Sequence, residues 1–260
     1  MGRLDGKVAL VTGGAKGLGE ADARCMAAEG AQVIVADMDT EAGQAVVKDI
    51  GKSAVFKQLD VANEEAWADV MSDVERDYGK LNVLVNNAGI VEPGNIETQT
   101  TDDYRKVLAV SLDGAYFGCK YAMPLMKKSG MCSIINMASI ASLQGEPYVL
   151  AYSAAKGAVE ALSRSIAAHC ALSKYTIRCN SVHPSGIVTP MVMSIEQKVL
   201  DAGLISLEDQ DAASKLSKLG EPNDIGHTVV FLASDESKFI NGAAIRVDNA
   251  MSIVCGVVPE

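Results

Sequence analysis

The stretch Thr12-Gly13-Gly14-Ala15-Lys16-Gly17-Leu18-Gly19 comes directly after the apolar run 8–11 and directly before a segment of helical period. Here Gly13, Gly17 and Gly19 allow a tight turn and let backbone N–H groups approach a phosphate at the start of a helix, where the helix dipole favours negative charge. The same residues could form an ordinary turn between a strand and a helix. The stretch therefore predicts a strand, a turn and a helix, with the turn as a candidate pyrophosphate site.

Apolar runs and helical segments alternate along the whole chain, and this alternation indicates the fold class. Short runs rich in β-branched residues lie at 8–11, 33–36, 54–59, 83–85, 133–137, 176–182 and 244–247. Segments of helical period lie at about 18–29, 40–49, 63–78, 101–127, 151–173 and 222–234. Such alternation is typical of βαβ units around a parallel sheet that helices cover on both faces. We predict a single α/β domain over residues 1–260, with a Rossmann-type doubly wound parallel sheet.

Two intervals do not follow this regular pattern. One is 139–150, which follows a predicted strand end, and the other is 190–219, which is rich in Met, Val, Leu and Ile. In open α/β sheets ligands bind beyond the carboxyl ends of the strands, so irregular segments that leave those ends are suited to line a pocket. We predict that both intervals form pocket walls and that about 190–219 is a substrate lid.

The composition argues against several classes of function. The formal net charge is -10 and no cluster of Lys and Arg is present, so a nucleic-acid partner is not expected. No apolar run approaches the length of a membrane span, and residues 1–7 lack the basic region and apolar stretch of a secretory signal. We expect a cytoplasmic protein with no membrane and no nucleic-acid partner.

The cysteines and histidines do not indicate a metal site. The six cysteines have no CxxC spacing, and several lie in apolar segments, where a thiol behaves as a small hydrophobic group. The three histidines have no metal-binding spacing such as HExxH. We predict that no metal is bound.

Asp37 is a candidate for binding the ribose of a dinucleotide. It ends the second predicted strand and lies 18 residues beyond Gly19, where an acid bonds the adenosine ribose hydroxyls. A carboxylate there would also repel a 2′-phosphate, which favours NAD over NADP. Lys16 favours the opposite choice, because a cation in the glycine turn can meet that phosphate. Asp37 would face the 2′ position directly, so we predict NAD; a solvated loop acid is the alternative for this residue.

Tyr152 and Lys156 form a candidate acid–base pair. They lie four residues apart in a predicted helix, so their side chains share one face. A phenol with its usual pKa of about 10 is a poor base at neutral pH, but a nearby ammonium lowers that pKa. Ser139, at a predicted strand end, is suited to hold the oxygen that exchanges its proton with Tyr152. A Tyr-x-x-x-Lys pair also arises by chance on helix surfaces, and its significance here comes from the other motifs.

Taken together, these motifs resemble the short-chain dehydrogenase/reductase family, from about Leu4 to Asn249. The matching stretches are Thr12 to Gly19, Asp60-Val61, Asn86-Asn87-Ala88-Gly89, Ser139, Tyr152 with Lys156, and Asn180-Ser181-Val182-His183-Pro184 through Thr189. The resemblance implies a homotetrameric cytoplasmic NAD(H)-dependent oxidoreductase that interconverts a secondary alcohol and a ketone.

The resemblance also assigns the cofactor-binding residues. It implies that Asp60 and Val61 surround the adenine, that 87–89 lies beside the adenosine ribose, and that the Ile187 backbone and the Thr189 hydroxyl hold the nicotinamide carboxamide. The full predicted cofactor set is Gly13, Lys16, Gly17, Leu18, Gly19, Asp37, Met38, Asp60, Val61, Asn87, Ala88, Gly89, Tyr152, Lys156, Pro184, Ile187 and Thr189.

Two positions depart from the family's pattern. Ser111 stands where the family usually has an asparagine that completes a catalytic tetrad with Ser139, Tyr152 and Lys156. A serine can bend a helix through its own hydroxyl, so we include Ser111 among the predicted catalytic residues and expect activity with an altered proton relay. Ser185 stands where the family usually has a glycine, which leaves the local backbone geometry open.

Within the family, the chain most resembles bacterial hydroxysteroid dehydrogenases of the 3beta/17beta or 3alpha/20beta type, through 2–7, 133–139 and 183–191. Apolar candidates for the pocket agree with a steroid, although a lid can also use them to pack on its own domain. These candidates are Ile140, Leu143, Tyr148, Met191, Val192, Met193 and Ile195. The alternatives are a dehydrogenase of another apolar cyclic alcohol, an NAD-binding protein without catalysis, and reduction of an acyl-thioester ketone, which Asp37 and the acidic balance disfavour.

Overall fold

Within residues 2–204 and 219–253, the parts of the chain that the computed structural model describes, seven strands form one parallel sheet. The strands are β1 (Val8–Thr12), β2 (Gln32–Asp37), β3 (Ala54–Gln58), β4 (Val83–Asn86), β5 (Cys132–Met137), β6 (Ile177–Pro184) and β7 (Ala244–Val247). Their order is β3-β2-β1-β4-β5-β6-β7, so the chain first winds outward from β1 and then returns to place β4 on its other side. The predicted doubly wound sheet is therefore confirmed.

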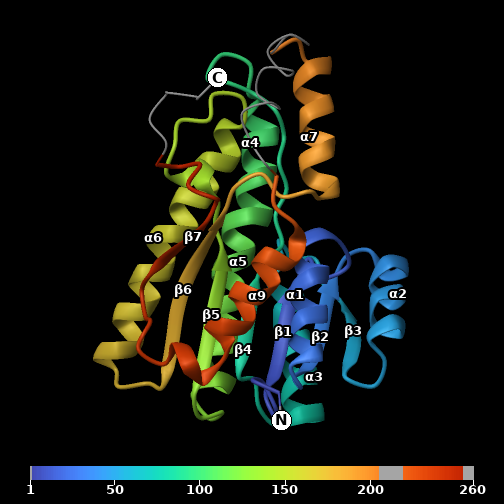
Figure 1. Cartoon of the computed structure of the whole chain (residues 1–260), viewed down its shortest axis with the longest axis vertical. Helices are drawn as coiled ribbons and strands as arrows, with labels where there is room; N and C mark the ends of the chain where they lie inside the picture. The colour runs from blue at the N-terminus through green and yellow to red at the C-terminus, as the bar shows by residue number, and fades with distance from the viewer. Residues whose placement is uncertain (1, 205–218, 254–260) are drawn as a thin grey trace.

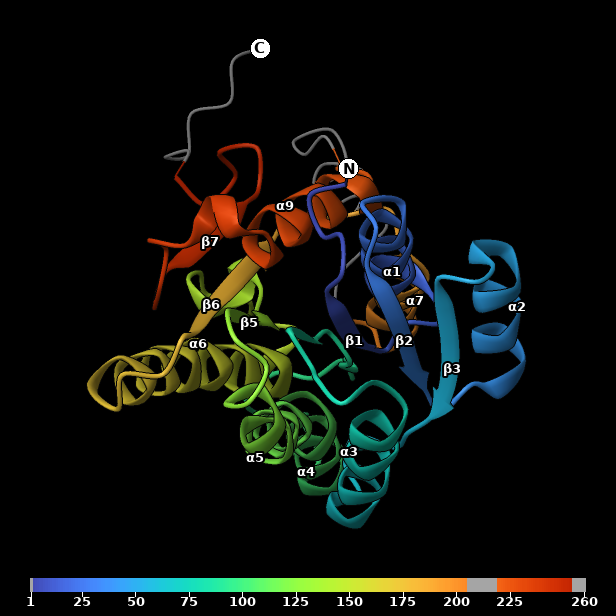
Figure 2. The ribbon, with the colours of Figure 1, turned by 90° about the horizontal axis from the view of Figure 1, so that it is seen from below.

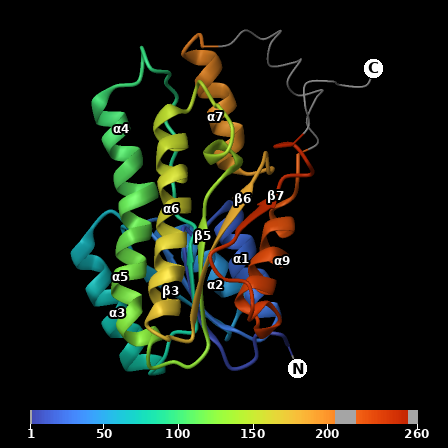
Figure 3. The same cartoon turned by 90° about the vertical axis from the view of Figure 1, so that its left-hand side faces the viewer.

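Helices cover both faces of the sheet (Figure 2). One face carries α1 (Gly17–Ala28), α2 (Thr40–Ile50) and α9 (Pro222–Ala233), and the other carries α3 (Glu64–Tyr78), α4 (Thr101–Leu108), α5 (Gly114–Met126) and α6 (Leu150–Leu172). Figure 3 shows α4, α5 and α6 as one layer beside the strands.

Successive residues of a strand point alternately into the two cores that these helices cover. Val8 and Leu10 of β1 pack with Trp67 of α3, whereas Ala9 and Val11 pack into the core beneath α1 and α9. Every residue of β1 is buried, which is why the sequence reads as a continuous apolar run and not as an alternating one. Since both faces of the sheet are apolar, polar functional groups are left for the strand ends.

The predicted helix 101–127 contains one irregular turn. It is divided into α4 and α5 by a π-helical turn, Ala109–Asp113, whose buried residue is Ser111. A π turn carries more residues than an α turn, and such turns are frequent at functional sites. The hydrophobic period is too weak a signal to reveal one extra residue, so the sequence predicted a single helix.

The interval 190–219 begins as a helix and not as an irregular segment. Helix α7 (Pro190–Asp201) starts after Thr189, whose hydroxyl oxygen accepts the Val192 N–H at 3.3 Å. It lies beyond the carboxyl ends of the strands, apart from the two helical layers (Figure 1). A capping threonine followed by proline marks a helix start, so the signal was present in the sequence. The part of the predicted lid at 205–218 lies outside the described residues.

An ion pair network connects α7 to the helix layer below it. Glu92, in the segment after β4, accepts from Lys198 of α7 and from Lys106 of α4, each at 2.9 Å. The two ammonium groups lower the pKa of the Glu92 carboxyl, Lys106 having the larger effect. Glu92 therefore stays ionised and holds α7 over the carboxyl ends of the strands.

No helix among the described residues combines the length and the apolar character needed to cross a membrane.

Candidate active site

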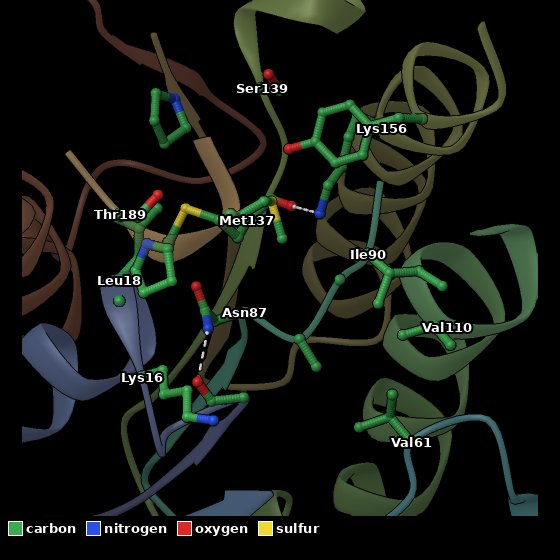
Figure 4. A pocket seen from close by; sticks show the side chains of 18 of the residues that line it. Lys16, Leu18, Val61, Asn87, Ile90, Val110, Met137, Ser139, Lys156 and Thr189 are labelled. Carbon is green, nitrogen blue, oxygen red and sulfur yellow. Dashed lines mark hydrogen bonds between the residues drawn. The ribbon is translucent and has the colours of Figure 1, made fainter. Parts of the chain in front are cut away.

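A cleft with a volume of about 380 Å³ lies at the carboxyl ends of the strands, where the strand order reverses between β1 and β4. It brings together nearly all of the residues predicted from the sequence (Figure 4). The predicted residues that line it are Gly13, Lys16, Gly17, Leu18, Asp37, Met38, Asp60, Val61, Asn87, Ala88, Gly89, Ser139, Tyr152, Lys156, Pro184, Ile187 and Thr189. Gly19 and Ser111 do not line it.

The cleft also contains residues that the motifs did not identify as cofactor or catalytic residues. These are Leu59, Ile90, Val110, Met137, Ala138, Ser185, Pro190, Met191 and Val192. Most directly follow or precede a predicted site residue at a strand end, and that position is the signal for them. Val110 is different, because it reaches the cleft from the π turn and has no such signal. Of the predicted substrate pocket, only Met191 and Val192 line this cleft.

The glycine turn shows the close backbone packing that a phosphate site requires. Gly13 and Gly17 have φ angles of +63° and +59°, in the left-handed region that favours glycine. A Cβ at Gly19 would lie 2.2 Å from the Gly13 carbonyl oxygen and 2.5 Å from Nδ2 of Asn87. Gly19 therefore lets the first turn of α1 pack against the glycine turn, and it shapes the site from behind.

Hydrogen bonds fix the glycine turn to the segment after β4. The Thr12 hydroxyl oxygen accepts the backbone N–H groups of Asn87 and Ala88, at 3.0 and 3.1 Å. The Asn87 side chain in turn donates to the Thr12 and Gly13 carbonyl oxygens, at 3.0 and 3.3 Å. The ends of β1 and β4 therefore form one rigid unit.

Asp37 is held in place at the end of β2. One carboxylate oxygen accepts the Ala15 N–H and the other accepts the Asp39 N–H, both at 3.0 Å. Lys16, which also lines the cleft, forms an ion pair with Asp39 through Nζ and Oδ2 at 2.6 Å. The donor set fits a dinucleotide: backbone N–H groups at a helix start for the pyrophosphate, and a carboxylate for the ribose hydroxyls.

Lys156 is buried at the other end of the cleft. Its ammonium donates to the Met137 carbonyl oxygen at 2.7 Å, a bond drawn in Figure 4, and lies 5.5 Å from the centre of the Tyr152 ring. The ammonium therefore points toward the carboxyl end of β5. Burial lowers the pKa of Lys156 to about 8.

The pKa of Tyr152 moves in the direction opposite to the one expected. Burial raises this pKa, and the smaller effect of the hydrogen bond with the Ser139 side chain lowers it. The phenol therefore stays protonated at neutral pH in this structure. A nearby ammonium lowers the pKa of a phenol, but the cost of placing a phenolate in a buried position is the larger effect here, and that cost cannot be read from the spacing of Tyr152 and Lys156.

The backbone of Ser139 is supported by a buried histidine. Nδ1 of His183 lies 3.1 Å from the Ser139 carbonyl oxygen and 3.0 Å from the Ser142 hydroxyl, which itself donates to that carbonyl at 2.6 Å. On the other side of the ring, Nε2 lies 2.8 Å from the Ser181 hydroxyl. Burial lowers the pKa of His183, so the ring is neutral and orients the turn that presents Ser139.

Ser111 acts on the wall of the cleft and not in the cleft. Its hydroxyl oxygen accepts the Ile90 N–H at 3.1 Å, and the same hydroxyl donates to the Ile90 carbonyl oxygen at 3.3 Å. A Cβ on Gly89 would lie 3.2 Å from Nζ of Lys156 and 3.3 Å from Oγ of Ser111. Gly89 thus allows both groups to pack close to it, and the geometry gives Ser111 a positioning role toward Ile90.

A family model described as "Enoyl-(Acyl carrier protein) reductase" matches residues 13–252, which include the whole glycine turn and the Tyr152–Lys156 pair. The chain belongs to the short-chain dehydrogenase/reductase family. It is an oxidoreductase of that family, and the predicted membership is confirmed.

Similar proteins cover nearly the whole chain. An NADP-dependent (R)-specific alcohol dehydrogenase of Lentilactobacillus kefiri is 42% identical over 95% of this chain and 96% of its own. A 3-beta-hydroxysteroid dehydrogenase of Comamonas testosteroni is 41% identical over 96% of this chain and 97% of its own. A trans-4-hydroxycyclohexanecarboxylate dehydrogenase of Sinomonas cyclohexanicum is 40% identical over 95% and 93%.

A side chain at position 19 tests the close packing of the glycine turn. We expect Gly19→Ala to lower the free energy of unfolding by about 1–3 kcal/mol, because its Cβ must displace the Gly13 carbonyl. We also expect it to weaken binding of the nicotinamide cofactor at least about tenfold, measured by calorimetry alongside urea unfolding. Gly145→Ala is the control, since a Cβ there meets nothing within 4 Å. Equal effects of both substitutions would contradict this role of Gly19.

The serine in the π turn can be tested by two substitutions. We expect Ser111→Ala to lower kcat/KM by about tenfold, because the Ile90 wall loses both of its bonds to Oγ. We expect Ser111→Asn to stay within about tenfold of the natural enzyme in steady-state kinetics. A gain of several orders of magnitude in the Ser111→Asn variant would show that the natural site is impaired by its serine.

Burial of Lys156 predicts a pH-dependent cost to stability. Its pKa is about 8 in the folded chain, against 10.5 when exposed, so the folded chain gives up this proton at lower pH than the unfolded chain does. Below about pH 8 the buried ammonium destabilises the folded state by on the order of 3 kcal/mol. This cost disappears as the pH rises from about 8 toward the pKa of the lysine in the unfolded chain.

We therefore expect Lys156→Met to be more stable than the natural chain near pH 7, and this advantage to shrink by about pH 9.5. Urea unfolding at both pH values measures the difference. The upper value stays below the titration of Tyr152, whose pKa burial raises. An advantage that is the same at both pH values would show that the ammonium is not desolvated.

Proposed function

We propose that this chain is an NAD(H)-dependent dehydrogenase that interconverts a secondary alcohol and a ketone, with a hydroxysteroid or ketosteroid as substrate. The observation that carries the proposal is that Ser139, Tyr152 and Lys156 line the same cleft as the glycine turn and Asp37. Proton-transfer groups and a dinucleotide cradle in one cleft are what hydride transfer to or from an alcohol carbon requires.

The side chains divide the work of the reaction. Bound NAD would accept the hydride from the alcohol carbon. In reduction the Tyr152 hydroxyl gives its proton to the substrate oxygen and becomes a phenolate. In oxidation Tyr152 must first give up its own proton, and the phenolate then takes the proton of the substrate hydroxyl; the Ser139 hydroxyl holds the same substrate oxygen in both directions. Lys156, with a pKa of about 8, is suited to stabilise the phenolate as it forms and to exchange a proton near neutral pH.

The choice of NAD rests on Asp37. Its carboxylate is fixed by the backbone of Ala15 and Asp39 and lines the cleft, so a cofactor that carried a 2′-phosphate would meet a negative charge. The relative from Lentilactobacillus kefiri is named as NADP-dependent, so the proposal of NAD rests on the residues of this cleft and not on that relative.

The proposed substrate is apolar and cyclic. Met191 and Val192, at the start of α7, give the cleft an apolar wall, and methionine adapts to irregular ligands. The names of the relatives from Comamonas testosteroni and Sinomonas cyclohexanicum give a hydroxysteroid and a hydroxycyclohexanecarboxylate as substrates of those proteins, and both are cyclic secondary alcohols. The alternative substrate for this chain is therefore another apolar cyclic secondary alcohol.

The proposal includes a cytoplasmic homotetramer and a substrate lid. The outer face of α6 supports the assembly, because Ala154, Ala161 and Ala168 are exposed there at intervals of one heptad and permit close helix contact. The lid would begin with α7, where Thr189 lines the cleft and also caps the helix. Thr189 would thus contact a bound nicotinamide and also cap the helix that begins the lid.

NADH formation with a panel of steroid and non-steroid secondary alcohols tests the function. We expect turnover of hydroxysteroids, and we expect Tyr152→Phe to lower kcat by about 10²–10⁴-fold while NAD still binds, because only the proton-transfer oxygen is removed. Turnover of simple cyclic alcohols with no steroid activity would overturn the substrate proposal. NAD binding without hydride transfer to any member of the panel would favour a binding protein that has lost catalysis.

A further inference from the structure

We propose that Asp39 is a cofactor-specificity residue: it holds the Lys16 ammonium in an ion pair, so that this cation does not favour a 2′-phosphate. The inference rests on the proposed function, because it concerns how the same cleft selects NAD over NADP. It assigns to Asp39 a role that the glycine turn and Asp37 do not explain.

Lys16 is the cation that a 2′-phosphate would meet. Among the described residues that line the cleft, the cations are Lys16 and Lys156, and they enter it from opposite sides (Figure 4). Lys156 is buried at the catalytic end, where its ammonium is bonded to the Met137 carbonyl. Lys16 belongs to the glycine turn and lies near Asp37, which ends β2. Attraction for an additional phosphate at the adenosine end therefore has to come from Lys16.

Asp39 is positioned in advance to bind that cation. Its Oδ1 accepts the Ala42 N–H at 3.0 Å and thereby caps the start of α2, while its Oδ2 lies 2.6 Å from Nζ of Lys16. Its backbone N–H is also fixed, since it donates to Asp37 at 3.0 Å. Because the cap already orders the carboxylate, the ion pair restricts only the Lys16 side chain.

The net charge of the side chains at this end of the cleft is therefore negative, and it repels a phosphate. Asp37 and Asp60, which line the cleft, and Asp39, which pairs with Lys16, contribute three negative charges against the one positive charge of Lys16. A 2′-phosphate adds about −1.5 to −2 charges near neutral pH. Without the charge of Asp39, Lys16 would offset Asp37 and would be free to turn toward the phosphate.

An exposed ion pair contributes little to stability, and Lys16 and Asp39 are 61% and 40% exposed. Specificity depends on a difference between two affinities, so the position of the ammonium matters more than the energy of the pair. Each partner also keeps the other ionised: their mutual hydrogen bond raises the pKa of Lys16 and lowers that of Asp39. The pair is present throughout the neutral pH range.

Asp39→Asn separates the two roles of this side chain. The amide oxygen still accepts the Ala42 N–H and preserves the cap, whereas the negative charge is lost. We expect the Kd for NADP⁺ to fall about tenfold, which is about 1.4 kcal/mol, and the Kd for NAD⁺ to change less than about twofold. Calorimetry on the full chain measures both constants, and the NADP⁺ gain should shrink as salt is added.

Two further variants make the test specific. Lys16→Met in the Asp39→Asn background should remove the NADP⁺ gain, because the gain depends on the released ammonium. Asp49→Asn is the matched charge control: this acid of α2 pairs with Arg24 at 3.2 Å, is 66% exposed and does not line the cleft. It should leave the Kd for NADP⁺ unchanged.

The outcomes separate this inference from the proposed function. If the natural chain binds NAD⁺ and Asp39→Asn does not tighten NADP⁺ binding, the role of Asp39 is wrong and the proposed function stands. An equal gain in Asp49→Asn would also overturn it, since overall charge would then be the cause. If the natural chain binds neither cofactor, the proposed function fails, and this inference fails with it.

Discussion

The burial of the parallel sheet on both faces is the constraint on which the rest of this structure depends. Apolar residues fill the two helix-covered layers, so the central strands β1, β4 and β5 have no solvated face where chemistry can take place. Polar groups gather at the carboxyl ends, and the reversal of strand order between β1 and β4 opens a cleft between the loops there. Thr12 and Asn87 then join the two sides of this opening through their hydrogen bonds.

Two buried asparagines join the central strands of the sheet beneath the cleft. Asn86 of β4 donates to Asn136 of β5 at 2.8 Å, and Asn136 donates to Ser163 of α6 at 2.9 Å. A buried amide that is hydrogen-bonded fixes register, because a shift of one residue would leave it without its partner. The network ties β4, β5 and α6 together, and these are the elements that present Gly89, Ser139 and Tyr152.

The sequence was sufficient for the sheet and for most of the cleft, because strand periodicity and strand-end position are local properties. The ion pair between Lys16 and Asp39 is a different case. These residues lie 23 apart in the chain and meet because β1 and β2 are neighbours in register, with Thr12 opposite Ala36. Burial has the same limitation: the raised pKa of Tyr152 depends on what surrounds the phenol, which no spacing of two residues can reveal.

The π turn at Ala109–Asp113 sets the rotational phase of the two helices that it joins. Each residue turns an α-helix by about 100°, so removing one residue would swing everything on one side of the turn around the helix axis. At present α5 directs Gly118 toward Asn86 and Trp67 while Ser111 reaches Ile90. A regular helix would keep one of these contacts and lose the other. The extra residue thus sets the rotation of α5 relative to α4 about the helix axis, so that the contacts with the core and with the cleft wall are both kept in one continuous helix.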